Sequence, residues 1–126
     1  MKFLSDQWAK ALTEGCNANS KFAKASKGHN AVFLVRVADS PQAASFSMTW
    51  RSGVVEVAAN PAGAEPDVTL DLGYPTMVEL SKGTVNGPLA VATGRMKAEG
   101  DMEKMFGLGK ALDLLPVVEA DLGIEY

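Results

Sequence analysis

Gly94-Arg95-Met96-Lys97-Ala98-Glu99-Gly100-Asp101-Met102 joins a short alternating stretch to the start of an apolar helix. Charged and apolar residues alternate up to Glu99, which is the pattern of a half-buried strand with Met96 and Ala98 facing inward. Gly100 then ends the strand. Asp101 is a favourable N-cap, because its side-chain oxygen can accept hydrogen bonds from the first free amides of a helix and its charge suits the helix dipole. The sequence therefore predicts a strand that turns directly into a helix.

The predicted helix after Asp101 carries an apolar stripe that also includes Gly109. Its apolar residues recur at spacings of three and four, or their multiples, which places them roughly on one face. A glycine inside a helix costs about 1 kcal/mol relative to alanine, so Gly107 and Gly109 need a structural reason. Two interpretations stay open: Gly109 leaves room for a guest molecule or lets the helix swing as a lid, or the glycines allow close packing or a kink.

The rest of the chain alternates between helical and strand patterns. Three further helices are predicted, the first capped by Ser5, the second capped by Asn19 or Ser20, and the third running from Pro75 to Gly83. Four further strands are predicted at residues 31–37, 45–51, 54–58 and 68–72, with a tight hairpin at residues 52–53.

Apolar side chains from several of these elements are predicted to face inward, and many of them are methionines. Methionine is flexible and polarizable, so a surface rich in it can re-form around guests of different shape. The alternative interpretation is that the methionines fill gaps in a closed core. The candidate ligand-binding residues are Phe46, Met48, Trp50, Leu70, Met77, Leu80, Met96, Met102, Met105, Phe106, Gly109, Leu112 and Leu115.

The second half of the chain resembles the sterol carrier protein type-2 family. Gly83, Pro88-Leu89-Ala90 and the stretch from Gly94 to Asp101 follow the order and spacing of the family's signature region, and residues 67–72 resemble its preceding strand. The resemblance implies a stand-alone, bacterial-like α/β (α+β) domain with a mainly antiparallel five-stranded sheet and helices on one face. It also implies a hydrophobic tunnel that takes sterols, fatty acids, fatty acyl-CoA or phospholipids, and no catalytic residues.

Length and composition are compatible with this resemblance. A chain of 126 residues with 47% hydrophobic and 21% charged residues fits a single domain over residues 1–126. No apolar run approaches the roughly 20 residues of a membrane span, and charged residues interrupt the apolar amino terminus, unlike a secretory signal. The single Cys16 fits a reducing compartment, and the last residues differ from a Ser-Lys-Leu peroxisomal address. We expect a cytoplasmic protein.

Charge is distributed unevenly along the chain. Residues 1–60 hold seven Lys or Arg against four Asp or Glu, whereas residues 61–126 hold five against eleven, and the whole chain carries −3. Lys21, Lys24 and Lys27 form a stripe that could meet anionic lipid headgroups or the phosphates of coenzyme A, or could be an ordinary solvated helix face. The overall negative charge argues against generic nucleic-acid binding.

Signals of catalysis are weak. One histidine and one cysteine cannot build the usual zinc sites, so neither a metal nor another cofactor is predicted. The segment 106–110 departs from a phosphate-binding loop, since Lys104 stands where the first glycine is needed and Ala111 replaces Ser or Thr. Cys16 and His29 could in principle form a nucleophile pair, but no local feature supports an activated thiolate.

The sequence therefore favours a non-catalytic carrier or presenter of lipids. Its expected partners are a hydrophobic small molecule and, transiently, a membrane surface or lipid-metabolising enzymes. Two alternatives remain: a scaffold that holds an intermediate such as an isoprenoid quinone precursor for partner enzymes, or a small enzyme using Tyr74, His29 or Asp71 as a proton donor. The amphipathic segment 117–124 is a candidate lid, whose removal after Pro116 should speed ligand release.

Overall fold

Five strands form one sheet in the order β3-β2-β1-β4-β5, in a computed structural model that describes residues 1–63 and 65–126. The strands are β1 (Ala31–Ala38), β2 (Ser45–Arg51), β3 (Val54–Ala59), β4 (Val68–Gly73) and β5 (Met96–Gly100). Only the central pair, β1 and β4, is parallel, and the other three pairs are antiparallel. The expectation of a mainly antiparallel five-stranded sheet is confirmed.

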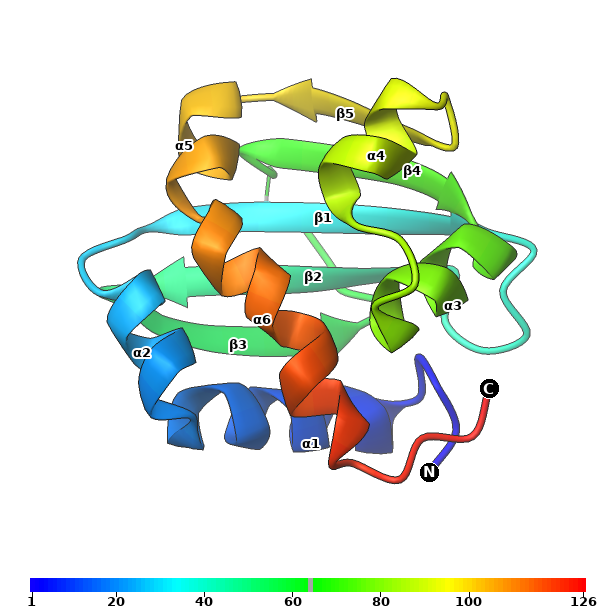
Figure 1. Ribbon diagram of the computed structural model, residues 1–126, viewed down its shortest axis with the longest axis horizontal. Helices are drawn as coiled ribbons and strands as arrows, with labels where there is room; N and C mark the ends of the chain where they lie inside the picture. Colours follow the sequence, from blue (N-terminus) through cyan, green and yellow to red (C-terminus); the bar gives the residue numbers. More distant parts are fainter. Residues whose placement is uncertain (64) are drawn as a thin grey trace.

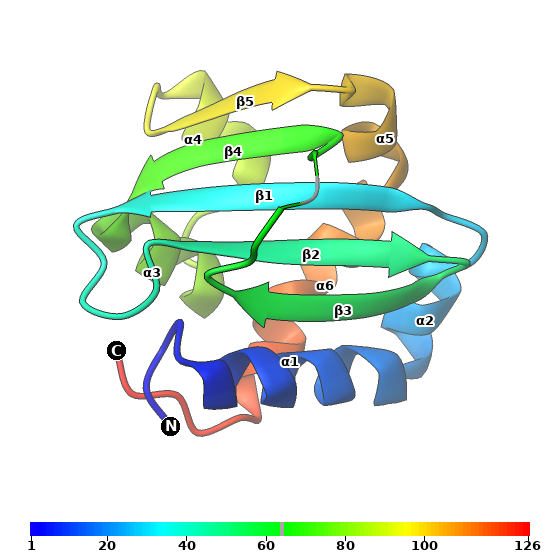
Figure 2. The same cartoon turned by 180° about the vertical axis from the view of Figure 1, so that it is seen from behind.

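Alternation along the strands separates an apolar face from a polar one. In β1, Phe33 and Val35 are buried, and the register places Phe33 between Met48 and Val68 on the neighbouring strands. The opposite face carries Thr and Ser side chains, the half-buried Val32 and Leu34, and an ion pair of 2.6 Å between Arg36 Nε and Asp71 Oδ1. Figure 2 shows that none of the described helices covers this polar face, so helices cover one face of the sheet, as expected.

Six helices lie on the apolar side or at its margin (Figure 1). They are α1 (Asp6–Ala18), α2 (Ser20–Ser26), α3 (Tyr74–Lys82), α4 (Gly87–Ala92), α5 (Met102–Gly107) and α6 (Gly109–Ala120). The predicted caps are confirmed: side chains of Ser5, Asn19 and Asp101 each accept a hydrogen bond from the amide three residues later.

Two helical features differ from the sequence-based expectation. The single helix predicted after Asp101 is two helices, because Leu108 ends α5 and begins α6 between its two glycine neighbours. Leu108 itself is fully buried, so the break turns an apolar side chain into the core. The short helix α4 was not predicted; Asn86 caps it and Pro88 lies in its first turn.

Helix α1 covers the outer edge of the sheet. The Asn17 side chain accepts from the Val55 amide at 3.1 Å and donates to the Val55 carbonyl at 2.8 Å. Thr13 Oγ1 accepts from the Val57 amide at 2.9 Å in the same way. These side chains occupy groups of β3 that a further strand would otherwise pair with, which protects the edge from association with another chain.

Candidate functional site

Five of the predicted ligand-binding residues belong to the inner face of the sheet. They are buried, at no more than 9% exposure, and comprise Phe46, Met48, Trp50, Leu70 and Met96. The Trp50 ring lies 5.4 Å from that of Phe33, and its indole nitrogen donates to Ser26 Oγ at 3.1 Å. The Phe46 ring packs edge-on against Trp8 at 5.1 Å. Phe46 and Trp50 therefore contribute mainly to packing of the core.

A second set of predicted residues lies half-buried on the helices above the sheet. We call these residues the inter-helix apolar group: Met77 and Leu80 on α3, Met102 and Met105 on α5, and Gly109, Leu112 and Leu115 on α6. All of its hydrophobic side chains pack against the core cluster. These seven of the thirteen predicted residues lie on three helices above the apolar face of the sheet.

The geometry of α6 shows which way this group faces. Gly109, Leu112 and Pro116 follow helical spacing and share one side of α6. A Cβ atom added at Gly83, the residue that ends α3, would lie 3.3 Å from Pro116 Cβ, so this side of α6 points toward α3. A Cβ atom added at Gly109 would meet no atom within 4 Å. There is open space beside the apolar group at Gly109.

The two glycines of the α5–α6 junction have different roles. A Cβ atom at Gly107 would lie 3.1 Å from His29 Cε1, so close packing explains that glycine. At Gly109 an added Cβ atom would meet no atom within 4 Å, so close packing does not explain that glycine.

Two expectations about this region are wrong. Phe106 does not face inward, because its side chain is 77% exposed. The segment 117–124 is no free lid: Val118 is 6% exposed, and a Cβ atom at Gly15 on α1 would lie 2.9 Å from Val118 Cγ1. Deleting the residues after Pro116 would remove part of the core rather than open a tunnel.

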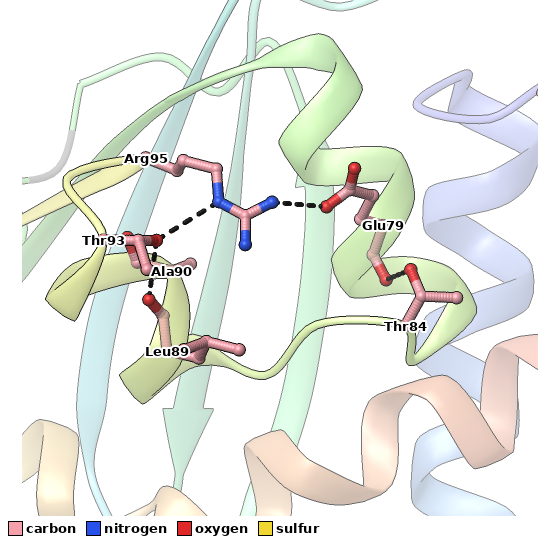
Figure 3. A network of polar contacts seen from close by, with 6 residues as sticks. All are labelled: Glu79, Thr84, Leu89, Ala90, Thr93 and Arg95. Carbon is pink, nitrogen blue, oxygen red and sulfur yellow. Dashed lines mark hydrogen bonds and ion pairs between the residues drawn. The ribbon is translucent and has the colours of Figure 1, made fainter.

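Helix α4 is held at its carboxyl end by a network of polar side chains (Figure 3). Arg95 Nη1 donates to Glu79 Oε2 on α3 at 2.8 Å, and Arg95 Nε donates to Thr93 Oγ1 at 3.2 Å. The Thr93 hydroxyl in turn donates to the Leu89 carbonyl at 2.8 Å. Glycines with left-handed backbone lie on both sides of α4, Gly83 at φ 76° and Gly94 at φ 75°. Arg95 thus ties the carboxyl end of α4 to α3.

The tunnel itself stays a prediction. Two surface hollows of the described chain lie away from the inter-helix apolar group, one beside Arg36 and Asp71 and one between α1 and β3.

The residues considered for catalysis do not gather in one place. Cys16 is fully buried, and burial, reinforced by Glu119, raises the pKa of its thiol to about 12. His29 lies against Gly107, whereas Asp71 pairs with Arg36 on the polar face, and that hydrogen bond lowers the pKa of Asp71. Within residues 1–63 and 65–126 no three His, Cys, Asp or Glu side chains are placed to hold a metal ion together.

One buried polar residue was missed by sequence reasoning. Glu119 is 5% exposed, and its Oε1 accepts a hydrogen bond of 3.1 Å from the indole nitrogen of Trp8. Desolvation raises its pKa to about 7, although hydrogen bonds from Trp8 and Ser81 oppose the rise. Its helical segment was interpreted as an amphipathic surface, and no local signal distinguishes this glutamate from a solvated one.

Comparisons with known proteins agree with the fold. The family model of the SCP-2 sterol transfer family matches residues 9–113. A crystal structure of sterol carrier protein 2 superposes with a TM-score of 0.76 at 17% identity, covering 95% of this chain and 98% of that one. A solution structure of a conserved hypothetical protein from Thermus thermophilus, possibly a sterol carrier protein, gives a TM-score of 0.81 at 17% identity, with 99% and 92% covered.

A third similar structure is that of the ubiquinone synthesis protein UbiJ-SCP2, with a TM-score of 0.62 at 17% identity and 98% and 99% of the two chains covered. No curated protein sequence matches this chain significantly. None of the helices in the described part of the chain is long and apolar enough to cross a membrane.

Proposed function

Because the chain belongs to the SCP-2 sterol transfer family, we propose that it binds a single lipid, catalyses no reaction on it, and carries or presents it inside the cytoplasm. Domains of this family generally bind lipids without catalysis. The cargo we propose is a fatty acid, a fatty acyl-CoA, a sterol-like molecule or a phospholipid. A buried, unpaired Cys16 fits the reducing conditions of the cytoplasm.

The observation that carries this proposal is the inter-helix apolar group beside the open space at Gly109. Its methionines, Met77, Met102 and Met105, are half-buried and can change rotamer at little cost. Each buried methylene of a ligand contributes about 0.8 kcal/mol, so an acyl chain can offset the cost of displacing side chains and ordering the complex. A cleft that opens around its guest suits cargo of varied shape.

Replacing Gly109 by leucine should block the cargo site. A Cβ atom added at Gly109 would meet no other atom within 4 Å, so we expect the variant to fold normally. Affinity for a fluorescent fatty acid should fall at least tenfold, because the leucine competes for the volume the acyl chain would fill. Titration by fluorescence measures the affinity, and a thermal melt checks the fold.

Ala120→Leu is the matched control, because it adds the same side chain to an exposed position at the other end of α6. Equal affinities of the two variants and the wild-type protein would contradict the proposed site. Native mass spectrometry of the freshly purified protein, followed by extraction of the bound molecule, then identifies the cargo class.

A second candidate function is favoured by the similarity to UbiJ-SCP2, whose name describes a ubiquinone synthesis protein. In this case the same apolar group would hold an isoprenoid quinone precursor for partner enzymes instead of transporting lipid. Extraction of a prenylated aromatic compound, together with co-purification of enzymes that modify it, would favour the scaffold over the carrier.

A further inference from the structure

Phe106 is an exposed aromatic side chain at one corner of the molecule. It is 77% exposed, the highest value among the large hydrophobic residues of the described chain. It lies at the end of α5, where Gly107 contacts His29 in the turn after α2. Figures 1 and 2 both show α2 and the α5–α6 junction at the same end of the sheet. An aromatic side chain in water at this place needs an explanation.

The same corner is rich in uncompensated positive charge. Residues 15–35 contain Lys21, Lys24 and Lys27 and no Asp or Glu. The three lysines are exposed along α2 and the turn after it, and Lys110 is exposed at the start of α6, which packs against α2. Within residues 1–63 and 65–126, none of these four lysines takes part in an ion pair.

Acidic residues lie at the margins of this corner. Lys104 is balanced by Asp67 at 3.2 Å, and Glu103 and Asp113 are exposed on α5 and α6. Figure 1 shows α2 at the β2–β3 side of this end of the sheet and α5 at the β4–β5 side, with the α5–α6 junction between them. Because charges further apart than about 8 Å are screened at physiological salt, the net charge of −3 does not cancel the local field of α2.

We propose that the corner formed by α2 and the α5–α6 junction docks on an anionic membrane surface, with Phe106 entering the interface and Lys21, Lys24, Lys27 and Lys110 facing the headgroups. Aromatic side chains favour the boundary between headgroups and acyl chains, and nearby lysines add attraction to anionic lipids. The open space at Gly109 lies two residues beyond Gly107. A docked corner would therefore place the cargo site beside the bilayer. That last step rests on the proposed function, whereas docking itself does not require cargo.

Vesicle sedimentation of the full chain tests the docking. We expect binding to vesicles of phosphatidylcholine with phosphatidylserine, weaker binding at high salt, and little binding to phosphatidylcholine alone. Phe106→Ser should lower the affinity about tenfold through lost apolar burial. The pair Lys24→Gln and Lys27→Gln should lower it about 25-fold, since each lysine near an anionic surface is worth about fivefold.

Matched controls remove comparable side chains elsewhere. Val54→Ser replaces an apolar side chain that is 60% exposed on β3, and Lys2→Gln with Lys10→Gln removes two exposed lysines from the amino-terminal segment. These controls should bind like the wild-type protein. Docking at this corner is rejected if the wild-type protein ignores phosphatidylserine, or if either control loses as much affinity as its partner variant. Because no cargo is added, the outcome is independent of the Gly109→Leu experiment.

Discussion

Replacing Gly100 by alanine is expected to destabilise the protein by about 3 kcal/mol or more. A Cβ atom at this position would lie 2.1 Å from the Asp67 carbonyl oxygen, and the backbone has φ +112°, which L-residues rarely adopt. Overpacking and backbone strain each cost about 1–3 kcal/mol, so the two together remove a large share of the roughly 5–15 kcal/mol that stabilises a small domain.

The damage should spread because Asp67 makes several contacts. Its carbonyl accepts from the Asp101 amide at 2.8 Å, and its carboxylate accepts from the Val32 amide at 2.8 Å and pairs with Lys104 at 3.2 Å. A shift of Asp67 would therefore loosen β4, β1 and the start of α5 together. Gly100 is required by close backbone contact, which gives a physical reason for the glycine that precedes the helix cap.

Urea unfolding of Gly100→Ala and Gly94→Ala distinguishes the cost of backbone strain from the cost of the steric clash with Asp67. Gly94 also has positive φ, at 75°, but an added Cβ atom there meets nothing within 4 Å. The Gly94 variant should lose only about 1 kcal/mol. If Gly100→Ala were no less stable than Gly94→Ala, the close contact with the Asp67 carbonyl oxygen would not be the reason why position 100 requires glycine.

The sequence predicted the sheet well because strand alternation is a local signal. Met96 is buried while Arg95 and Lys97 are exposed, and the same alternation holds from Phe46 to Trp50. Each residue type matched the face on which it lies. The parallel pairing of β1 with β4 has no such signal, since it depends on which strands meet after a long connection.

Three helix starts were predictable from their polar caps, whereas α4 was not predicted although Asn86 caps it. Ser5, Asn19 and Asp101 were identified because a short side-chain oxygen precedes each helix. At Leu108 no polar cap marks the break, and Leu108 makes no side-chain capping hydrogen bond to α6. Only Gly107 and Gly109 indicated the helix break from sequence. The burial of Leu108 in the core accounts for its position.

The candidate site was predictable in type but less so in detail. Helical spacing selected Met102, Met105 and Leu112 correctly as residues facing the core. The same spacing placed Phe106 inward, which is wrong because its side chain is 77% exposed, although it lies in the same helix as Met102 and Met105. The helix is too short for spacing alone to determine which side of the stripe is buried.

Glu119 could not be predicted because its environment is created by residues distant in sequence. Its hydrogen-bond partner Trp8 is 111 positions away. Ser81 on α3 and Tyr126 near the carboxyl terminus share a hydrogen bond of 2.7 Å. The Ser81 hydroxyl lowers the pKa of Glu119, and the charge of Glu119 adds to the rise in the pKa of Tyr126 that burial causes. Cys16 on α1 is the other titratable group that couples to it. Three helices and the carboxyl-terminal segment thus meet around one acid.

Replacing Glu119 by glutamine is expected to stabilise the protein above neutral pH. Burial raises the pKa of Glu119 in the folded protein to about 7 from its ordinary 4.5. The folded protein therefore holds the proton more tightly than the unfolded chain, so stability falls as pH rises from about 4.5 to 7 and the loss is complete above that range. A shift of this size corresponds to about 3 kcal/mol. Glutamine keeps an acceptor for Trp8 and carries no charge.

Thermal and urea unfolding at pH 5 and pH 8 measure this effect. At pH 5 the variant and the wild-type protein should be nearly equal, and at pH 8 the variant should be the more stable by about 2–3 kcal/mol. Glu103→Gln, at an exposed position on α5, controls for the change in net charge. A wild-type protein whose stability is unchanged or rises between these pH values would show that Glu119 does not carry a raised pKa.

Glu119→Leu distinguishes the charge of this residue from its hydrogen bond. Leucine also removes the ionisation, but it leaves the Trp8 indole N–H buried without an acceptor, which costs about 1–3 kcal/mol. We therefore expect Glu119→Leu to be less stable than Glu119→Gln at every pH, with the same flat pH dependence. This ordering would explain why an acid stands in the core: Trp8 requires an oxygen there, and the carboxyl group supplies one at low cost only while it keeps its proton.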